Sequence, residues 1–407
     1  MSSLVSIRPR AENSAPLSLI DKLRRGPVVD KFFLLGAIIS FLGLGYLGSH
    51  LWLMRTGYMT PSTHLNELRL LHAELQLFVF FGLFIVGFCL QAGPRLLNVS
   101  APLSLLGVIL AAALPIVAVT IRLFDPASSL PPFLYAASFL IALTAIVQLS
   151  LNASRIPPFI PLLSFGLVAC AVSCFLPITR PEVALLVLWA GVGSAVLGVW
   201  QVFIANLLGG KRLGVRATFL CALTHLATLI SLGLLYLTED RLWGVCAGAF
   251  GSFTLCLYFF ATRGWRAVVG SRRPALQLAT VAAFLWALSA WALLASSLII
   301  VDEAFHVLAT GFASSLVIAL SLHIVGHLGG GEALSTGWSV FAISLWQLVP
   351  LMRGYSRLFH LPQVSASIVG IIATIVVLIW ITGLVRCEIR ILRRQAQLRG
   401  AEEMVRD

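Results

Sequence analysis

Residues 69–92 read RLLHAELQLFVFFGLFIVGFCLQA. After Arg69, the ionisable side chains in this stretch are His72 and Glu74, and an almost uninterrupted apolar run follows them. The run is long enough to cross the roughly 30 Å hydrocarbon core of a bilayer as a helix. Ionisable side chains inside a membrane are costly and usually functional. The stretch therefore predicts a membrane helix with two side chains that need partners.

The chain as a whole is far more apolar than an average soluble domain. Of its 407 residues, 59% are hydrophobic and 11% are charged, and the mean hydropathy is +0.97. Apolar runs of about 20 residues, the length of a membrane-spanning helix, recur along it. They predict twelve membrane helices, at 32–54, 69–92, 102–123, 131–151, 157–177, 183–208, 215–237, 242–262, 276–300, 303–328, 334–353 and 363–386. We therefore expect an all-α integral membrane protein. It would consist of a basic tail (1–30), one twelve-helix domain (31–388) and a C-terminal tail (389–407).

The net charge of +12 is better explained by membrane topology than by nucleic-acid binding. With the N-terminus in the cytoplasm, seven of the 28 Lys and Arg fall on the outer side, which leaves 28 − 7 = 21 on the inner side. The seven are Arg55, Arg69, Arg122, Arg180, Arg241, Arg353 and Arg357. An excess of Lys and Arg in cytoplasmic loops sets the orientation of membrane proteins. The pattern predicts that both termini are cytoplasmic and that the lipid bilayer, not a nucleic acid, is the partner.

Two histidines are predicted to lie at the same depth in the bilayer. His72 is about one turn into the second predicted helix, and His306 is about one turn into the tenth. Both helices should run from the outer to the inner side. Two neutral imidazoles on facing helices can bind a heme iron from opposite sides. No Cys-x-x-Cys-His occurs, so covalent attachment is not expected, which favours a b-type heme.

The remaining buried histidines have two interpretations each. His225 lies near the middle of the seventh helix, where it is a metal ligand or a hydrogen-bond partner of a neighbouring helix. His323 and His327 share one face at the inner end of the tenth helix. They bind a metal or an anion together, or they are interfacial polar residues. His323 lies about 25 Å from His306 along the helix and cannot bind the same iron.

Glu74 and two cysteines are further candidates. Glu74 is about 200° around the helix from His72, so it faces away from a ring bound there. We expect it to be protonated or paired, with Arg69 or with a polar group on a neighbouring helix. It is then a second-site ligand, a proton acceptor or a structural hydrogen-bond partner. Cys170 and Cys174 are one turn apart and either face a metal or pack as small apolar residues, the more common role of buried cysteine.

Several motifs resemble those of the NnrS family. The stretch His72-Ala73-Glu74-Leu75-Gln76-Leu77-Phe78, followed by Gly82, Gly87-Phe88 and Pro94, is similar to its second-helix motif. His306-Val307-Leu308-Ala309-Thr310-Gly311 and Gly326-His327-x-Gly329 resemble its tenth-helix motifs, and Arg263-Gly264-Trp265-Arg266 resembles a stretch before helix nine. More distantly, His72 and His306 resemble the low-spin heme ligands of heme-copper oxidase subunit I, which also lie on helices two and ten.

The resemblance implies a heme- and copper-containing protein of the bacterial inner membrane, linked to nitric oxide metabolism and nitrosative stress. Nitric oxide and an electron donor are the implied partners. Glu74 stands where the family has a second histidine. The oxidase copper ligands on helices six and seven are not reproduced, because helix six offers Trp200 and Gln201 and helix seven offers His225. A three-histidine copper site, and with it oxygen or nitric oxide reduction as in a classical oxidase or reductase, is therefore not expected, while copper stays a possible second metal that the resemblance implies.

A different function class fits the same helix count. Twelve-helix secondary transporters often contain interrupted helices around a site at the membrane midplane. Gly337, Pro350 and Gly354 around the eleventh predicted helix are features of this kind. A transporter without heme is the alternative interpretation, and a heme absorption spectrum distinguishes the two.

Overall fold

The computed structural model describes residues 29–406 except 56, 58, 61, 98, 100–104, 154–155, 158, 268–272, 329 and 361–364. Its secondary structure elements in this part of the chain are all helical. In the first half they are α2 (Val29–Ser40), η1 (Phe41–Gly48), α3 (Ser49–Arg55), α4 (Leu65–Glu74), η2 (Leu75–Phe80), α5 (Phe81–Leu97), α6 (Leu105–Phe124), α7 (Leu130–Leu151), α8 (Ile160–Ser173), α9 (Pro181–Val187), η3 (Leu188–Gly193) and α10 (Ser194–Leu207). In the second half they are α11 (Val215–Thr238), α12 (Arg241–Ala261), η4 (Gly264–Ala267), α13 (Pro274–Ala295), α14 (Val301–His306), η5 (Val307–Ser314), α15 (Ser315–Leu328), α16 (Thr336–Trp346), α17 (Leu348–Gly354) and α18 (Ser365–Arg406).

These elements correspond to the predicted spans, and the all-α membrane bundle is confirmed. Within the described residues, nine helices are long and apolar enough to cross a membrane. The fifth span is shorter than predicted, because α8 ends at Ser173. The eleventh is divided into α16 and α17 at Gln347. Pro350 explains the break, because its nitrogen cannot donate a hydrogen bond to the carbonyl of Trp346 one turn before it.

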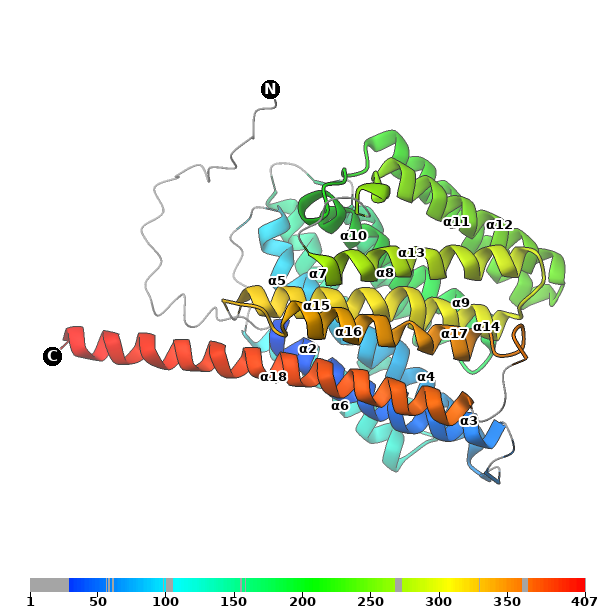
Figure 1. Cartoon of the computed structure of the whole chain (residues 1–407), viewed down its shortest axis with the longest axis horizontal. Helices are drawn as coiled ribbons and strands as arrows, with labels where there is room; N and C mark the ends of the chain where they lie inside the picture. The colour runs from blue at the N-terminus through cyan, green and yellow to red at the C-terminus, as the bar shows by residue number, and fades with distance from the viewer. Residues whose placement is uncertain are drawn as a thin grey trace.

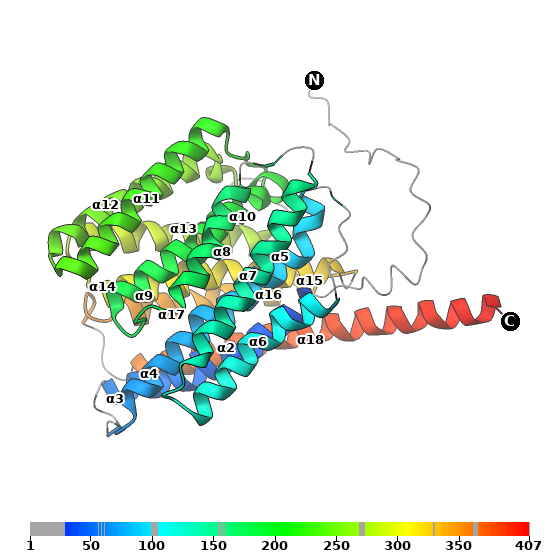
Figure 2. The ribbon, with the colours of Figure 1, turned by 180° about the vertical axis from the view of Figure 1, so that it is seen from behind.

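The helices form a bundle whose two faces can be followed in the figures. In Figure 1, α15, α16 and α17 cross between α13 and α18, and Figure 2 shows α7 and α8 on the opposite face. The hairpin of α11 and α12 packs on itself and, through α12, on α13. α18 continues through the predicted C-terminal tail, and its red end extends beyond the bundle (Figure 1). Residues 1–28 of the predicted N-terminal tail lie outside the described residues.

Close helix contacts in this bundle depend on small residues. A Cβ atom added to Gly166 of α8 would lie 2.8 Å from the backbone nitrogen of Ala195 and 2.8 Å from the carbonyl oxygen of Gly191. Backbone atoms cannot move to make room for this Cβ atom, as the end of a flexible side chain could. Lipid tails are as apolar as leucine, so helices in membranes associate through this kind of packing and often use small residues at their contacts. Gly166 therefore allows α8 to lie directly against η3 and α10.

Four helices contain π-helical segments, η1, η2, η3 and η5. Such segments are uncommon in proteins and are frequent at functional sites. η2 begins directly after α4, which carries His72, and η5 begins directly after His306, the last residue of α14. Each candidate ligand therefore lies where the helix changes from α to π geometry.

The Gly166 contact leads to a stability prediction. Gly166→Ala should lower the free energy of unfolding by about 1–3 kcal/mol, because a Cβ atom added in this packed contact forces the backbones apart. Gly233→Ala in α11 is the matched control, since a Cβ there meets no atom within 4 Å. Thermal unfolding of the two variants in detergent measures the difference. Equal melting temperatures would contradict the packing described.

Candidate functional site

A cavity of about 570 Å³ lies at the end of the bundle where α4 and α14 begin, and both predicted heme ligands line it. Figures 1 and 2 show α3, α4, α14 and α17 at this same end. Other polar residues of the wall are Ser49, Arg69, Gln76, Thr179, Asp302, Thr310, Ser314 and Arg353. The volume is within the range of small-molecule and cofactor sites. The structure thus brings His72 and His306, which are far apart in the sequence, to one cavity.

The His72 side chain is oriented by the first helix. Its Nδ1 lies 2.9 Å from the backbone carbonyl oxygen of Gly43 in η1. A carbonyl can only accept, so Nδ1 carries the proton and Nε2 keeps its lone pair. This arrangement is typical of metal-binding histidines, whose second nitrogen is usually held by a carbonyl or a carboxylate. The ring also lies close to η1, because a Cβ on Gly48 would be 3.0 Å from Cε1 of His72.

His306 has the same tautomer, fixed within its own helix. Its Nδ1 donates to the carbonyl oxygen of Asp302, at 2.7 Å, and lies 3.5 Å from the Oδ1 atom of the Asp302 carboxylate. The ring of Phe305 contacts the imidazole edge to face, with centroids 5.1 Å apart. The lone pair of the His306 ring is therefore also on Nε2.

Arg353 of α17 occupies the Nε2 side of the His306 ring, where a metal would bind. Its guanidinium donates to Nε2 of His306 at 3.0 Å and lies 3.5 Å from the Asp302 carboxylate. It also lies over the ring of Trp52, 5.0 Å from the centroid. A metal bound to Nε2 requires this guanidinium to move away. A ligand that carries carboxylates would offer it an alternative partner.

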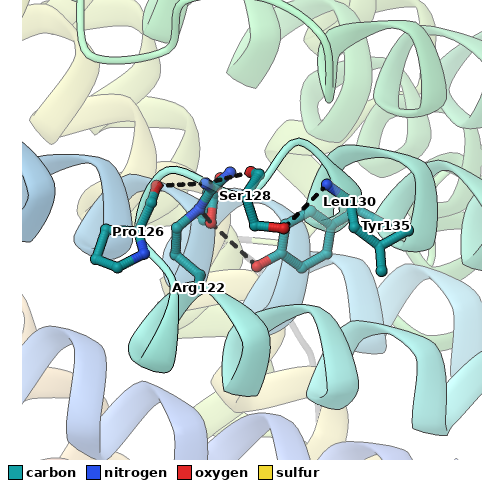
Figure 3. A network of polar contacts seen from close by, with 6 residues as sticks. Arg122, Pro126, Ser128, Leu130 and Tyr135 are labelled. Atoms are coloured by element: carbon teal, nitrogen blue, oxygen red, sulfur yellow. Dashed lines mark hydrogen bonds and ion pairs between the residues drawn. The ribbon is translucent and has the colours of Figure 1, made fainter.

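Glu74 points away from the cavity and forms a buried ion pair with Arg122 of α6. The closest contact is 2.8 Å, from Nη2 of Arg122 to Oε1 of Glu74, and both side chains are less than a tenth exposed. Tyr135 of α7 donates to the other carboxylate oxygen at 3.2 Å. Figure 3 shows how Arg122 also holds the loop between α6 and α7, through the carbonyl groups of Pro126 and Ser128, each at 2.8 Å.

The partner of Glu74 is thus on a neighbouring helix, one of the two options expected, and is not Arg69. Arg69 instead donates to the carbonyl of Thr179, at 3.3 Å. The Glu74 carboxylate is saturated by a cation and a phenol, so its contacts are those of a structural group. Arg122 was counted among the charges of the outer side, yet it is buried.

The other candidate histidines, His225, His323 and His327, do not line the cavity. His225 is buried, and its Nε2 lies 2.7 Å from the hydroxyl of Ser194 on α10. The rings of Trp189 and Phe165 surround it, with centroids 5.4 and 6.5 Å away. His323 lies 3.2 Å from the guanidinium of Arg273, and His327 is exposed.

Metal clusters do not form from these residues. In the part of the chain that the structure describes, no three His, Cys, Asp or Glu side chains are grouped so that they could hold a metal ion. The surroundings of His225 therefore do not fit a copper site, which needs further nitrogen or sulfur ligands. Cys170 and Cys174 are both buried, and the Cys174 thiol donates to the carbonyl of Cys170 at 3.2 Å.

Two residues of the cavity were not predicted from the sequence. Asp302 lies four residues before His306, a spacing that places both on one helix face and could have identified it. Arg353 follows Pro350 near the end of the eleventh span and was interpreted only as an outer charge. Its position beside His306 depends on how α17 packs on α14, which the sequence alone does not predict.

Comparisons with known proteins give support at the level of the fold. No protein-family model matches the chain, and no curated protein is significantly similar to it in sequence. A solved cryo-EM structure of a heme-copper terminal oxidase dimer resembles it with a TM-score of 0.56 and 14% sequence identity. The match covers 90% of this chain and 84% of the oxidase chain. The chain therefore has a fold like that of a heme-copper terminal oxidase, and membership of the NnrS family stays a prediction.

The buried ion pair leads to a prediction with an internal control. Arg122→Met should lower the free energy of unfolding by about 3–5 kcal/mol, because it leaves the Glu74 carboxylate buried without its cation. Arg180→Met removes a contact of the same length, 2.8 Å to Glu239, but an exposed one, and should change stability little. Unfolding in detergent compares the two. An equally small loss in both variants would show that the Glu74 carboxylate is not buried as described.

Proposed function

We propose that this protein binds heme in the membrane between His72 and His306. The observation that carries the proposal is the matched state of the two imidazoles. Both line one cavity of about 570 Å³, and both hold Nδ1 on a backbone carbonyl, so that the lone pair of each ring is on Nε2, although Nε2 of His306 accepts from Arg353 until that guanidinium moves. The fold shared with a heme-copper terminal oxidase supports the same interpretation. A b-type heme is consistent with the absence of a Cys-x-x-Cys-His motif.

The remaining polar residues of the cavity suit the carboxylates of a heme. Arg69 and Arg353 both line its wall. Guanidinium groups bind carboxylates with two parallel hydrogen bonds, and such charge-assisted bonds are strong in a site shielded from water. On heme binding, Arg353 would exchange the Nε2 atom of His306 for a carboxylate of the cofactor. Bound heme would supply one-electron redox chemistry at its iron.

Electron transfer is the activity that this arrangement favours. If His72 and His306 both hold the iron, they would leave no position at which oxygen or nitric oxide could bind. The histidines that would form a copper centre beside it are not reproduced in the sequence. A role in nitric oxide metabolism or in the response to nitrosative stress is supported by the sequence resemblance of helices two and ten to the NnrS family. The electron donor would be a separate protein or a membrane-soluble carrier.

An absorption spectrum of the purified protein tests the proposal. The wild type should show the sharp bands of a six-coordinate low-spin heme. His72→Ala and His306→Ala should each abolish that spectrum, since each removes one of the two residues that would hold the iron. His323→Ala is the control, because this residue lies beside Arg273 and away from the cavity. Unchanged spectra of both cavity variants would refute the assignment. An equal loss in the His323 variant would show that the effect is structural.

The orientation in the membrane forms part of the proposal. We place the protein in the bacterial inner membrane with both termini in the cytoplasm, because the Lys and Arg excess lies on their side. Reporter fusions should show the loop 55–68, with His64, on the periplasmic side and residue 407 on the cytoplasmic side. The opposite pattern would place the cavity in the inner half of the bilayer.

The transporter alternative has one observation in its favour. α16 and α17 form an interrupted helix, and Gln347 at the break accepts a hydrogen bond from Trp286 at 2.7 Å. Interrupted helices often surround transporter substrate sites. A purified wild-type protein that is colourless after growth with sufficient heme would favour this alternative.

A further inference from the structure

Five cationic side chains gather where α10 ends, α11 begins and α12 ends. They are Lys211, Arg212 and Arg216 of the first segment and Arg263 and Arg266 of the second, and we call them the basic patch. Arg263 is half-buried and the other four are exposed. None of the five side chains forms an ion pair or a hydrogen bond with another residue that the structure describes.

The neighbouring sequence supplies no counter-charge to the basic patch. Neither 208–238 nor 241–273 contains an Asp or a Glu. Elsewhere in the bundle a basic residue has an acidic partner, since Lys31 of α2 lies 3.1 Å from the carboxylate of Glu388 on α18. A surface lined by charges of one sign concentrates ions of the opposite sign. The basic patch therefore attracts an anion that is not part of this chain.

Main-chain contacts hold the two segments of the basic patch together. The backbone nitrogen of Lys211 donates to the carbonyl oxygen of Thr262 at 2.7 Å. The backbone nitrogen of Leu213 donates to Oε1 of Gln201 on α10 at 3.2 Å, which ties the first segment to the bundle. Membrane topology requires an excess of Lys and Arg on one side, but not that two loops are joined. Because the cations are already gathered, a ligand binds them at a lower entropic cost.

Apolar side chains beside the basic patch are open to the bilayer. Phe219 and Leu223 follow Arg216 by three and seven residues, so they share its face of α11, and Phe219 is 67% exposed. After α12, the ring of Trp265 packs on the exposed Phe260, with centroids 6.0 Å apart. Tryptophan is enriched at the level of the lipid headgroups. Both views show the hairpin of α11 and α12 at the edge of the bundle (Figures 1 and 2).

We propose that the basic patch binds the phosphate headgroup of an anionic phospholipid, whose acyl chains lie on the exposed faces of α11 and α12. Guanidinium groups form strong charge-assisted hydrogen bonds with phosphate. Basic pockets at the ends of membrane helices bind anionic headgroups in this way. A soluble phosphate compound would contact the cations but would gain nothing from Phe219, Phe260 and Trp265. The site is independent of the proposed heme.

Native mass spectrometry of the purified, delipidated full-length protein tests the proposal. The protein is supplied with equal amounts of phosphatidylglycerol, which is anionic, and phosphatidylcholine, which is zwitterionic. The wild type should retain phosphatidylglycerol in preference. Lys211→Gln combined with Arg266→Gln should weaken the binding of phosphatidylglycerol on the order of 25-fold, about fivefold for each charge, and leave that of phosphatidylcholine unchanged. A wild type without this preference would overturn the proposal.

A second double variant separates the site from the overall charge. Arg386→Gln combined with Arg393→Gln removes the same charge from exposed positions of α18, a helix that packs on α2, α15, α16 and α17. This variant should keep the wild-type preference. An equal loss in both double variants would show a general attraction of anionic lipid to a basic protein, and would overturn the site.

Two further measurements identify the ligand as a lipid. Trp265→Ala should weaken the binding of both phospholipids by a similar factor, because the indole contacts the lipid without distinguishing the charge of its headgroup. Unchanged binding of both would overturn the placement of the lipid beside α12. Inorganic phosphate at millimolar concentration should not displace bound phosphatidylglycerol from the wild type. Its displacement would mean that the basic patch is a site for free anions, and would overturn the proposal.

Discussion

The need to pair every polar group in an apolar medium organises the part of the molecule around the cavity. An unpaired carboxylate or guanidinium costs several kcal/mol when it leaves water. On α4, His72 faces the cavity and Glu74, two residues later, faces α6 and α7, where Arg122 and Tyr135 receive it. Contacts on two opposite faces therefore hold α4 in place. The ion pair behind α4 fixes its rotation, and that rotation directs His72 to Gly43 and the cavity.

The π-helical segments extend this arrangement along the chain. η5 follows His306 directly, η2 begins three residues after His72, and η1 carries the carbonyl that orients His72. A π turn shifts the residues after it around the helix axis relative to α geometry. The side chains before and after the transition can therefore face different neighbours. The histidines face the cavity, while the phenylalanines after His72 pack in the core.

The sequence predicts the helices well and the polar contacts poorly, for a physical reason. Apolar runs of membrane length are local properties, so the spans could be located without knowledge of the fold. The depth of His72 and His306 follows from their positions in those spans, and the structure places both at one cavity. The partner of Glu74 lies 48 residues away in the sequence, and its choice over Arg69 depends on how α4 and α6 pack. Arg353 and His306 are 47 residues apart in the sequence, and their contact depends in the same way on how α17 and α14 pack.

The central claim is that the protein holds a heme with two histidine ligands, and electron paramagnetic resonance of the oxidised, purified protein tests it most directly. Two neutral imidazoles produce a low-spin ferric signal, which our account predicts in an amount equal to the heme content of the preparation. A high-spin signal in the wild type would mean that one histidine does not bind the iron. A purified protein without heme, from cells with sufficient heme, would contradict the account.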